Sequence, residues 1–303
     1  MNLLVVLGPT ASGKTHLAVR LACELNGEII SADSRQVYRG MDIGTGKDLQ
    51  EYEIDGHKIP YHLINSVDPG YEYNVYEFQQ DFLKAYESIT ERGRIPILCG
   101  GTGLYIESVL TGYRLPKLEP NPELESMLES KSTAELTDLL NTLRDPHNTT
   151  DILDRKRLIK AIRIGLEESR KTEHHREFPK IQTTVFGIAP PREELRRRIT
   201  ERLHKRLEHG MVEEVNRLLA SGISPETLTF YGLEYKFITL FLQGKLTCDE
   251  MVAQLNTGIH QFAKRQITWF RRMEKKGITI HWVNPGLTPE DQLNEILANV
   301  PPI

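Results

Sequence analysis

The sequence contains few cysteines and no long hydrophobic run. Its 303 residues include only three cysteines, Cys23, Cys99 and Cys248, and no two of them form a CxxC pair. This pattern argues against a zinc site or a disulfide scaffold and is typical of a reducing compartment. No apolar stretch approaches the roughly 20 residues that a bilayer-spanning helix needs, and the first eight residues lack the basic region of a signal peptide. We therefore expect a cytoplasmic protein without a membrane-spanning segment.

A strong excess of one charge sign is also lacking. The formal net charge is −4, which taken alone argues weakly against a polyanionic partner. The charge is unevenly distributed, because residues 1–150 sum to −9 and residues 151–210 to +6. Residues 155–163 hold five cations and no acid, and residues 264–276 hold six cations and one acid. One such run is usually a solvated helix face, but two of them on an acidic protein favour a local site for a polyanion.

The first hundred residues alternate between strand-like and helix-like segments. Residues 3–7 and 95–99 are continuous apolar runs, which is typical of strands buried on both faces. Helices are expected at residues 14–25, where leucines recur every four residues, and at residues 74–91, which start with a capping box. Further strands are expected at residues 28–32, 183–189 and 278–283. This βαβ pattern predicts an α/β fold, in which helices cover both faces of an open parallel sheet.

The alternation stops near residue 116, where a cluster of prolines marks a boundary. Helix starts follow at residues 121 and 132, and a third helix is expected from about residue 151 to 171. No strand pattern occurs until strand character returns after residue 180. We therefore predict a mostly helical insertion domain at residues 116–183, inside a discontinuous catalytic core made of residues 1–115 and 184–303.

Residues 8–15 match the phosphate-loop motif G-x-x-x-x-G-K-[ST]. A buried strand precedes the motif and an amphipathic helix follows it, so the fold is expected to be P-loop NTPase-like. The glycines let backbone N–H groups converge on phosphate oxygens, Lys14 adds a cation, and the Thr15 hydroxyl can ligate Mg²⁺. The candidate diphosphate-binding residues are Gly8, Pro9, Thr10, Ala11, Ser12, Gly13, Lys14 and Thr15. The motif does not identify the reaction, because kinases, GTPases and transferases share it.

Asp33 directly follows the second predicted strand. Ligands of open parallel sheets bind beyond the carboxyl ends of the strands, so we expect Asp33 to face the phosphate loop. A kinase would use such a carboxylate to orient an acceptor hydroxyl. A single Asp at this position is at least as often the cap of a turn or helix, and both interpretations stay open.

Four segments together make the sequence similar to a known family. They are GPTASGKT at residues 8–15, ADSRQVYRGMDIGTGK at 32–47, CGGTGLY at 99–105 and FAKRQITWFRR at 262–272. In this order they resemble tRNA dimethylallyltransferases, also called tRNA isopentenyltransferases. The resemblance covers nearly the whole chain, although the insertion matches most loosely. The second and fourth segments are far more specific to this family than the phosphate loop is.

The resemblance implies a reaction and a role for each matching residue. Family members transfer a dimethylallyl group from dimethylallyl diphosphate to the N6 amine of adenosine 37, beside the anticodon, in tRNAs that read codons beginning with U. The products are N6-isopentenyladenosine and diphosphate. By this resemblance Asp33 is the general base, Thr10 hydrogen-bonds the bridging oxygen of the donor, and Mg²⁺ on Thr15 stabilises the leaving group. The same resemblance implies that the acceptor tRNA is contacted by Asp33, Ser34, Arg35, Gln36 and Thr102.

The two basic runs fit an RNA partner once they are placed on helices. Lys156, Lys160 and Arg163 share one helical face, which suits phosphates. A family segment that contacts the tRNA anticodon stem-loop is matched by Lys156, Arg157, Leu158, Ile159 and Lys160. On the last long helix, Arg265 is expected to reach the donor diphosphate or a tRNA phosphate, whereas Phe262 and the pair Trp269-Phe270 are expected in the core. We expect the protein to act as a monomer.

The sequence departs from the family pattern at several positions. Asp48 stands where the family usually has Pro, and Asn65 stands where it has Asp. His260 replaces an Arg that is thought to help hold phosphate in the family. Because His is only partly charged near pH 7, donor affinity is expected to be weaker or pH-dependent. One interpretation is a divergent paralogue with a shifted tRNA preference.

Other functions stay open from the residues alone. A P-loop nucleotide or nucleoside kinase would explain the phosphate loop and Asp33, but it leaves the basic insertion without a role. An isopentenyltransferase acting on free adenine nucleotides needs no large basic surface for its small acceptor. A non-catalytic RNA-binding ATPase does not require Asp33 beside the loop.

Overall fold

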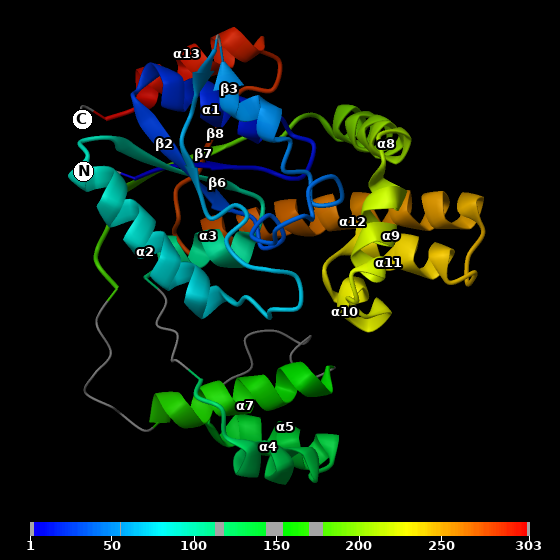
Figure 1. The fold of residues 1–303 in the computed structure, drawn as a ribbon. Coiled ribbons are helices and arrows are strands. Elements are labelled where there is room, and N and C mark those ends of the chain that lie inside the picture. Colours follow the sequence, from blue (N-terminus) through cyan, green and yellow to red (C-terminus); the bar gives the residue numbers. More distant parts are fainter. Residues whose placement is uncertain (1–2, 55, 113–117, 144–153, 170–177, 302–303) are drawn as a thin grey trace. The chain divides into compact units, whose positions relative to one another are not determined.

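The core of the protein is a six-stranded sheet in a computed structural model that describes residues 3–54, 56–112, 118–143, 154–169 and 178–301 (Figure 1). All five strand pairs in the sheet are parallel. In spatial order the strands are β5 (Tyr61–His62), β2 (Gly27–Ala32), β6 (Ile95–Gly100), β1 (Leu3–Leu7), β7 (Thr183–Gly187) and β8 (His281–Trp282). The open parallel sheet predicted from the sequence is confirmed, although the last strand is much shorter than the expected 278–283.

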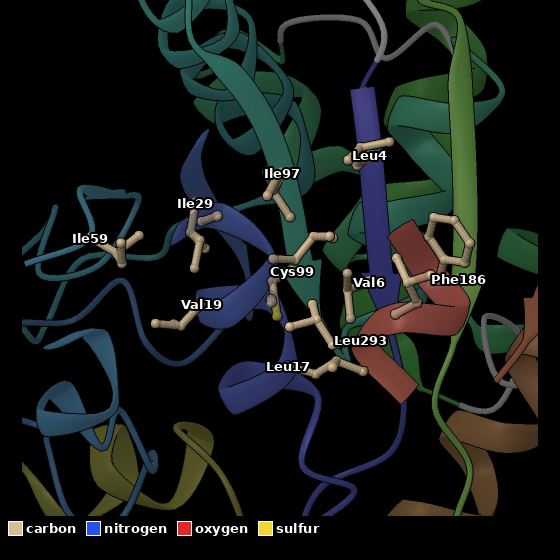
Figure 2. Close-up of a cluster of buried hydrophobic side chains, with 14 of the residues drawn as sticks. Leu4, Val6, Leu17, Val19, Ile29, Ile59, Ile97, Cys99, Phe186 and Leu293 are labelled. Carbon is tan, nitrogen blue, oxygen red and sulfur yellow. The ribbon is translucent and has the colours of Figure 1, made fainter. Parts of the chain in front are cut away.

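Both faces of the sheet are covered by helices, as expected for strands that are apolar throughout. One face packs on α1 (Lys14–Glu24) and α13 (Pro289–Asn299), and the other on α2 (Val75–Glu91) and α3 (Gly103–Leu110) (Figure 1). Figure 2 shows alternate strand residues such as Leu4, Val6 and Ile97 in one buried cluster with Leu293 of α13. This alternation follows the two-residue period of a strand.

A second core lies among five C-terminal helices. They are α8 (Arg192–Glu208), α9 (Met211–Ala220), α10 (Pro225–Phe230), α11 (Leu233–Leu242) and α12 (Cys248–Lys275). Val37, Tyr38 and Met41, which follow β2, are buried in this core. The helices therefore support the segment that carries the family-specific motif. The sequence predicted α8 and α12 but did not separate α9, α10 and α11, and it did not identify α13.

Local capping signals correctly placed several helix starts. Asn74 accepts the backbone N–H groups of Tyr76 and Glu77 at the start of α2, and the Glu77 side chain accepts the Asn74 N–H in return. Thr247 and Glu250 form the same reciprocal pair at α12. Such pairs satisfy helix N–H groups that have no partner within the helix. A short 3₁₀ helix, η1 (Leu49–Tyr52), and the hairpin β3 (Glu53–Ile54) and β4 (His57–Lys58) were not predicted.

Residues 112–179 form a separate compact unit. Its described helices are α4 (Pro122–Glu129), α5 (Thr133–Leu143) and α7 (Arg155–Ser169), and their shared core includes Leu128, Leu136 and Ile162. The first unit consists of residues 1–111 and 180–303. Each boundary lies four residues before the predicted one, and residue 183, which was predicted in the insertion, belongs to β7 of the sheet. None of the helices in the described ranges combines the length and the hydropathy of a membrane span.

Candidate phosphate-loop active site

The phosphate loop connects the central strand β1 to α1. A Cβ on Gly8 would lie 2.5 Å from the Ile188 carbonyl oxygen and 2.7 Å from Ser12 Oγ, so only glycine fits there. Gly13 has φ of 87°, a left-handed conformation that glycine adopts without a steric penalty. Glycine is thus required at position 8 by the close approach of other atoms, and at position 13 by the left-handed backbone of the turn. Together they place the loop at the N-terminus of α1, where backbone N–H groups favour anions.

Two side chains of the loop, Lys14 and Ser12, indicate that it binds an anionic ligand. Lys14 Nζ donates a hydrogen bond to the Pro9 carbonyl at 3.3 Å, and burial lowers the pKa of its ammonium, while Cys99 and Asp33 oppose that shift. The Ser12 hydroxyl is buried and has no hydrogen-bond partner among the described residues. A buried hydroxyl without a partner is costly. A phosphate oxygen in the loop would satisfy it.

Thr15 is the loop residue with a metal-ligating hydroxyl. The nearby Cys99 thiol donates to the Lys14 carbonyl at 3.8 Å, and burial raises the pKa of Cys99 to about 12, so the thiol is neutral. In the described ranges no group of three His, Cys, Asp or Glu side chains could hold a metal ion. The donor set fits a Mg²⁺ that is bound mainly through phosphate oxygens and water, with Thr15 as the protein ligand.

Asp33 lies at the end of β2, directly beside the end of β6. Because Ala32 pairs with Gly100 in the sheet, the segments that follow the two strands meet. The Ser34 N–H donates to Thr102 Oγ1 at 3.0 Å, and the Arg35 N–H donates to Asp33 Oδ1 at 2.9 Å. Asp33 therefore does cap a turn, as the alternative interpretation proposed. Its other oxygen, Oδ2, has no hydrogen-bond partner within the described part of the chain, so the turn does not use the whole carboxylate.

Gln36 is held in a fixed position behind Asp33. Its amide nitrogen donates to the Gly46 carbonyl at 3.1 Å, and its amide oxygen accepts from Ser31 Oγ at 2.9 Å. Lys47 follows Gly46 and is fully buried, and its ammonium donates to three oxygens: Tyr38 O at 2.5 Å, Asp42 Oδ1 at 2.6 Å and Asn65 Oδ1 at 2.6 Å. Residues 36–47 are thus tied together internally. Asn65, a departure from the family, supplies one of these acceptors.

Glu214 of α9 anchors the same segment from outside. Its carboxylate accepts the N–H groups of Asp42, Ile43 and Gly44 at 2.8, 2.8 and 3.0 Å, and it also accepts the Tyr235 hydroxyl at 2.7 Å. Charge-assisted hydrogen bonds of this kind are strong in a buried setting. The sequence analysis missed Glu214 and Tyr235, because no local pattern connects them to residues 42–44.

Gln266 of α12 links the phosphate loop to the loop after β6. Its amide oxygen accepts the Thr10 N–H at 2.9 Å, and its amide nitrogen donates to the Gly101 carbonyl at 2.9 Å. This explains why the KRQ segment lies near the site, although the sequence assigned no role to Gln266. The neighbouring Arg265 is exposed, and its guanidinium lies 5.9 Å from the ring centre of Phe262. Its expected contact with a diphosphate stays a prediction.

Two further residues of α12, Phe262 and His260, can be compared with what the sequence predicted for them. Phe262 was predicted in the core, but 40% of its surface is exposed, because it lies at the edge of the buried face of α12 and not at its centre. His260 Nε2 lies 3.3 Å from Thr200 Oγ1. Burial, together with the charge of Arg196, lowers the pKa of His260. It is therefore neutral near pH 7 and does not replace the charge of an arginine.

An arginine stripe on α8 is the main feature that sequence reasoning missed near the loop. Arg198, Arg202 and Arg206 recur every four residues and so share one helix face. Arg198 Nη1 lies 4.0 Å from where a Cβ of Gly13 would be, and the charge of Arg202 contributes to the lowered pKa of Lys14, after burial. The stripe thus adds positive charge beside the phosphate loop. The four-residue spacing was visible in the sequence, where only the leucines of this helix were noted.

The basic segment of the insertion lies on α7. Lys156, Arg157 and Lys160 are exposed, as a phosphate-binding face requires. Leu158 is a correction, because its side chain is fully buried in the core of the insertion and cannot contact RNA. Arg163 is a second correction. It pairs with Glu125 and donates to the Glu119 carbonyl at 2.8 Å, so it joins helices of the insertion instead of extending the cationic face.

A phosphate loop after the central strand β1, with a carboxylate after β2 on the far side of β6, is typical of P-loop transferases and kinases. Comparison with known proteins identifies the family. Residues 36–273 match the family model described as IPP transferase. The chain is 57% identical to tRNA dimethylallyltransferase 2 of Bacteroides fragilis, covering 97% of this chain and 96% of the relative. It is 55% identical to tRNA dimethylallyltransferase 2 of Phocaeicola vulgatus, covering 98% and 96%. The chain belongs to the IPP transferase family of tRNA dimethylallyltransferases.

Solved structures support the same assignment. The tRNA isopentenylpyrophosphate transferase of Bacillus halodurans has a TM-score of 0.72 and 33% identity, covering 98% of this chain and 95% of that one. A eukaryotic dimethylallyltransferase described as acting on tRNA has a TM-score of 0.77 and 25% identity, covering 99% of this chain and 81% of that one. The resemblance noted in the sequence is therefore confirmed at the level of family and fold.

Proposed function

We propose that this protein transfers a dimethylallyl group from dimethylallyl diphosphate to the N6 amine of adenosine 37 in tRNAs that read codons beginning with U. The products are N6-isopentenyladenosine and diphosphate. The observation that carries the proposal is the position of Asp33, at the end of β2, beside a phosphate loop whose Ser12 hydroxyl lacks a partner among the described residues. A carboxylate and an anion site side by side suit a reaction that loses a proton at one end and diphosphate at the other.

The donor diphosphate would bind to residues 8–15. The backbone N–H groups, Lys14 and the Ser12 hydroxyl would hold its oxygens, and the arginine stripe of α8 would add long-range attraction. Mg²⁺ held by Thr15 would supply further charge neutralisation of the leaving group. Thr10 would hydrogen-bond the bridging oxygen, and Gln266, which accepts the Thr10 N–H, would hold Thr10 in place for this contact.

The acceptor adenine would bind to residues 33–36 and Thr102. Flipping a base out of an already unpaired loop costs only a few kcal/mol. The N6 nitrogen would attack the allylic carbon, the carbon–oxygen bond to diphosphate would break, and the N6 proton would pass to Asp33 Oδ2. Ser34 and Gln36 would contact the adenine edge. The Arg35 guanidinium lies 5.3 Å from the ring centre of Phe230, which is 58% exposed, so the two could stack with neighbouring bases.

The tRNA anticodon stem-loop would be bound by the exposed cations of α7. Lys156, Arg157 and Lys160 are suited to its phosphates, and the partly buried Ile159 would support them. We further propose that the protein acts in the cytoplasm as a monomer. The location is supported by the few unpaired cysteines and by the tRNA acceptor that this reaction requires.

The test is a reaction of the protein with dimethylallyl diphosphate, Mg²⁺ and unmodified tRNA, followed by mass spectrometry of the nucleosides. We expect N6-isopentenyladenosine in the tRNA. Parallel reactions contain AMP as the acceptor, or radiolabelled ATP with nucleosides. Prenylated AMP without prenylated tRNA, or phosphate transfer from ATP, would support the alternative functions and contradict this one.

A further inference from the structure

Asp48 lies against the arginine stripe that borders the phosphate loop. Its Oδ2 atom accepts hydrogen bonds from Arg202 and from Arg206, the latter at 3.1 Å. The three side chains are largely buried, with 26%, 32% and 14% of their surfaces exposed for Asp48, Arg202 and Arg206. The two guanidinium groups hold the pKa of Asp48 below its usual range, although burial acts in the opposite direction. One carboxylate therefore partly neutralises two cations.

The backbone fixes Asp48 in this position. Its φ of 44° is left-handed, a conformation that Asp and Asn adopt more readily than other residues with a side chain. The preceding Lys47 is fully buried on three oxygen acceptors, and Arg202 and Arg206 approach Gly46 closely. Asp48 is thus presented to the stripe by a rigid segment and cannot easily move away from it.

The same stripe reaches the phosphate loop at its other end. Arg198 borders Gly13, and Arg202 is near enough to Lys14 to affect the pKa of its ammonium. A diphosphate in the loop would therefore attract Arg202, and Asp48 would hold Arg202 back and repel the diphosphate. Glu51 and Glu234 also act on these arginines, and burial raises the pKa of both. Glu194 bonds Arg198 at 2.7 Å, and Asp48 is the carboxylate that bonds Arg202 and Arg206.

We propose that Asp48 is an internal competitor of the donor diphosphate for the arginine stripe, so that it weakens binding of the diphosphate and promotes its release as product. This inference rests on the proposed binding of a diphosphate to residues 8–15. Asp48 acts on the diphosphate indirectly, as a positioning residue that holds Arg202 and Arg206.

The test is calorimetric titration of inorganic diphosphate with Mg²⁺ into the full-length protein and its Asp48→Asn variant. Asn keeps the shape of the side chain and tolerates the left-handed backbone, so the change removes mainly the charge. We expect binding to become tighter by roughly fivefold, as for one partly screened charge interaction. Damage to the fold would weaken binding, so a gain in affinity cannot come from a structural defect.

Three controls make the outcome decisive. Asp68→Asn removes the same charge from an exposed ion pair with Arg39 and should leave the affinity unchanged. Asp48→Glu keeps the charge and should not reproduce the gain in affinity. In the double variant Asp48→Asn/Arg202→Gln the gain should disappear. Unchanged or weaker binding in Asp48→Asn, while the unaltered protein binds diphosphate, would overturn the inference alone. Absence of diphosphate binding in the unaltered protein would overturn the proposed function as well.

Discussion

The phosphate loop depends mainly on its own glycines and has one side-chain support from afar, Gln266, whereas the segment from Asp33 to Lys47 is held by several side chains far away in the sequence. Residues 8–15, the donor side, depend on Gly8 for a close approach and on Gly13 for a left-handed turn. Residues 33–47, the acceptor side, depend on Glu214 of α9 and on Thr102 after β6. A loop that binds a common anion can be locally complete, but a site for one particular base requires support from several elements.

Gln266 and the arginine stripe connect the two sides. Gln266 bonds the donor side at Thr10 and the loop after β6 at Gly101. Arg202 affects Lys14 on the donor side and pairs with Asp48, directly after the acceptor side. The difference between the two sides can therefore be tested by variants that should alter the function of one and leave the other intact.

The largest effect is expected for Asp33→Asn. The amide oxygen can still accept the Arg35 N–H, so the turn is kept, but the variant cannot take the N6 proton. Transfer should fall by at least about 10³-fold, with affinities for tRNA and diphosphate nearly unchanged. Single-turnover kinetics and filter binding measure the two quantities. Turnover close to that of the unaltered protein would exclude Asp33 as the base.

A smaller loss is expected for Lys14→Ala, which alters the donor side alone. Removing the ammonium should lower kcat/KM for dimethylallyl diphosphate by about 10²-fold, the size typical of one lost charge-stabilising donor. The affinity for tRNA should not change. Steady-state kinetics with each substrate varied in turn separate these effects, and Lys245→Ala, on an exposed surface, is the matched control. An equal loss for both substrates would contradict the separation of the two sides.

Glu214→Gln should alter the acceptor side alone. The amide nitrogen of Gln cannot accept hydrogen bonds, so the two donors that bond one of the carboxylate oxygens lose their acceptor. We expect this loss to lower the free energy of unfolding by roughly 2 kcal/mol. We expect kcat/KM for tRNA to fall about tenfold, while the affinity for diphosphate stays the same. Chemical denaturation and calorimetry provide the two readouts. Glu213→Gln, at an exposed neighbouring position, should have no effect, and a weaker diphosphate affinity in Glu214→Gln would count against local support of the acceptor side.

The smallest effects are expected for Lys156→Ala and Lys160→Ala on α7. Each should weaken tRNA binding a few-fold and lower the slope of log affinity against log salt by roughly one. Binding measured at several salt concentrations tests this, with Lys131→Ala in the same unit as a control for general charge. A salt response that is unchanged in both variants would remove α7 from tRNA binding.

Local signals account for what the sequence could predict. The buried strands at residues 3–7 and 95–99, the phosphate loop and the capping boxes at Asn74 and Thr247 all depend on neighbouring residues, and the structure confirms them. The anchoring of residues 42–44 by Glu214 spans about 170 positions, so no periodicity or motif reports it. Phe262 was misplaced because it lies at the edge of the buried face of α12, which helical spacing alone does not distinguish from the centre of that face, and Arg163 because an ion pair within the insertion holds it.

Position-resolved mass spectrometry of tRNA after reaction with dimethylallyl diphosphate tests the central claim most directly. Digestion of the product into fragments assigns the modified nucleoside to a single position. The account predicts an isopentenyl group on N6 of adenosine 37, in tRNAs that read codons beginning with U, and its loss in the Asp33→Asn variant. Modification of free adenine nucleotides alone, of another tRNA position, or of tRNA by Asp33→Asn at the unaltered rate would contradict it.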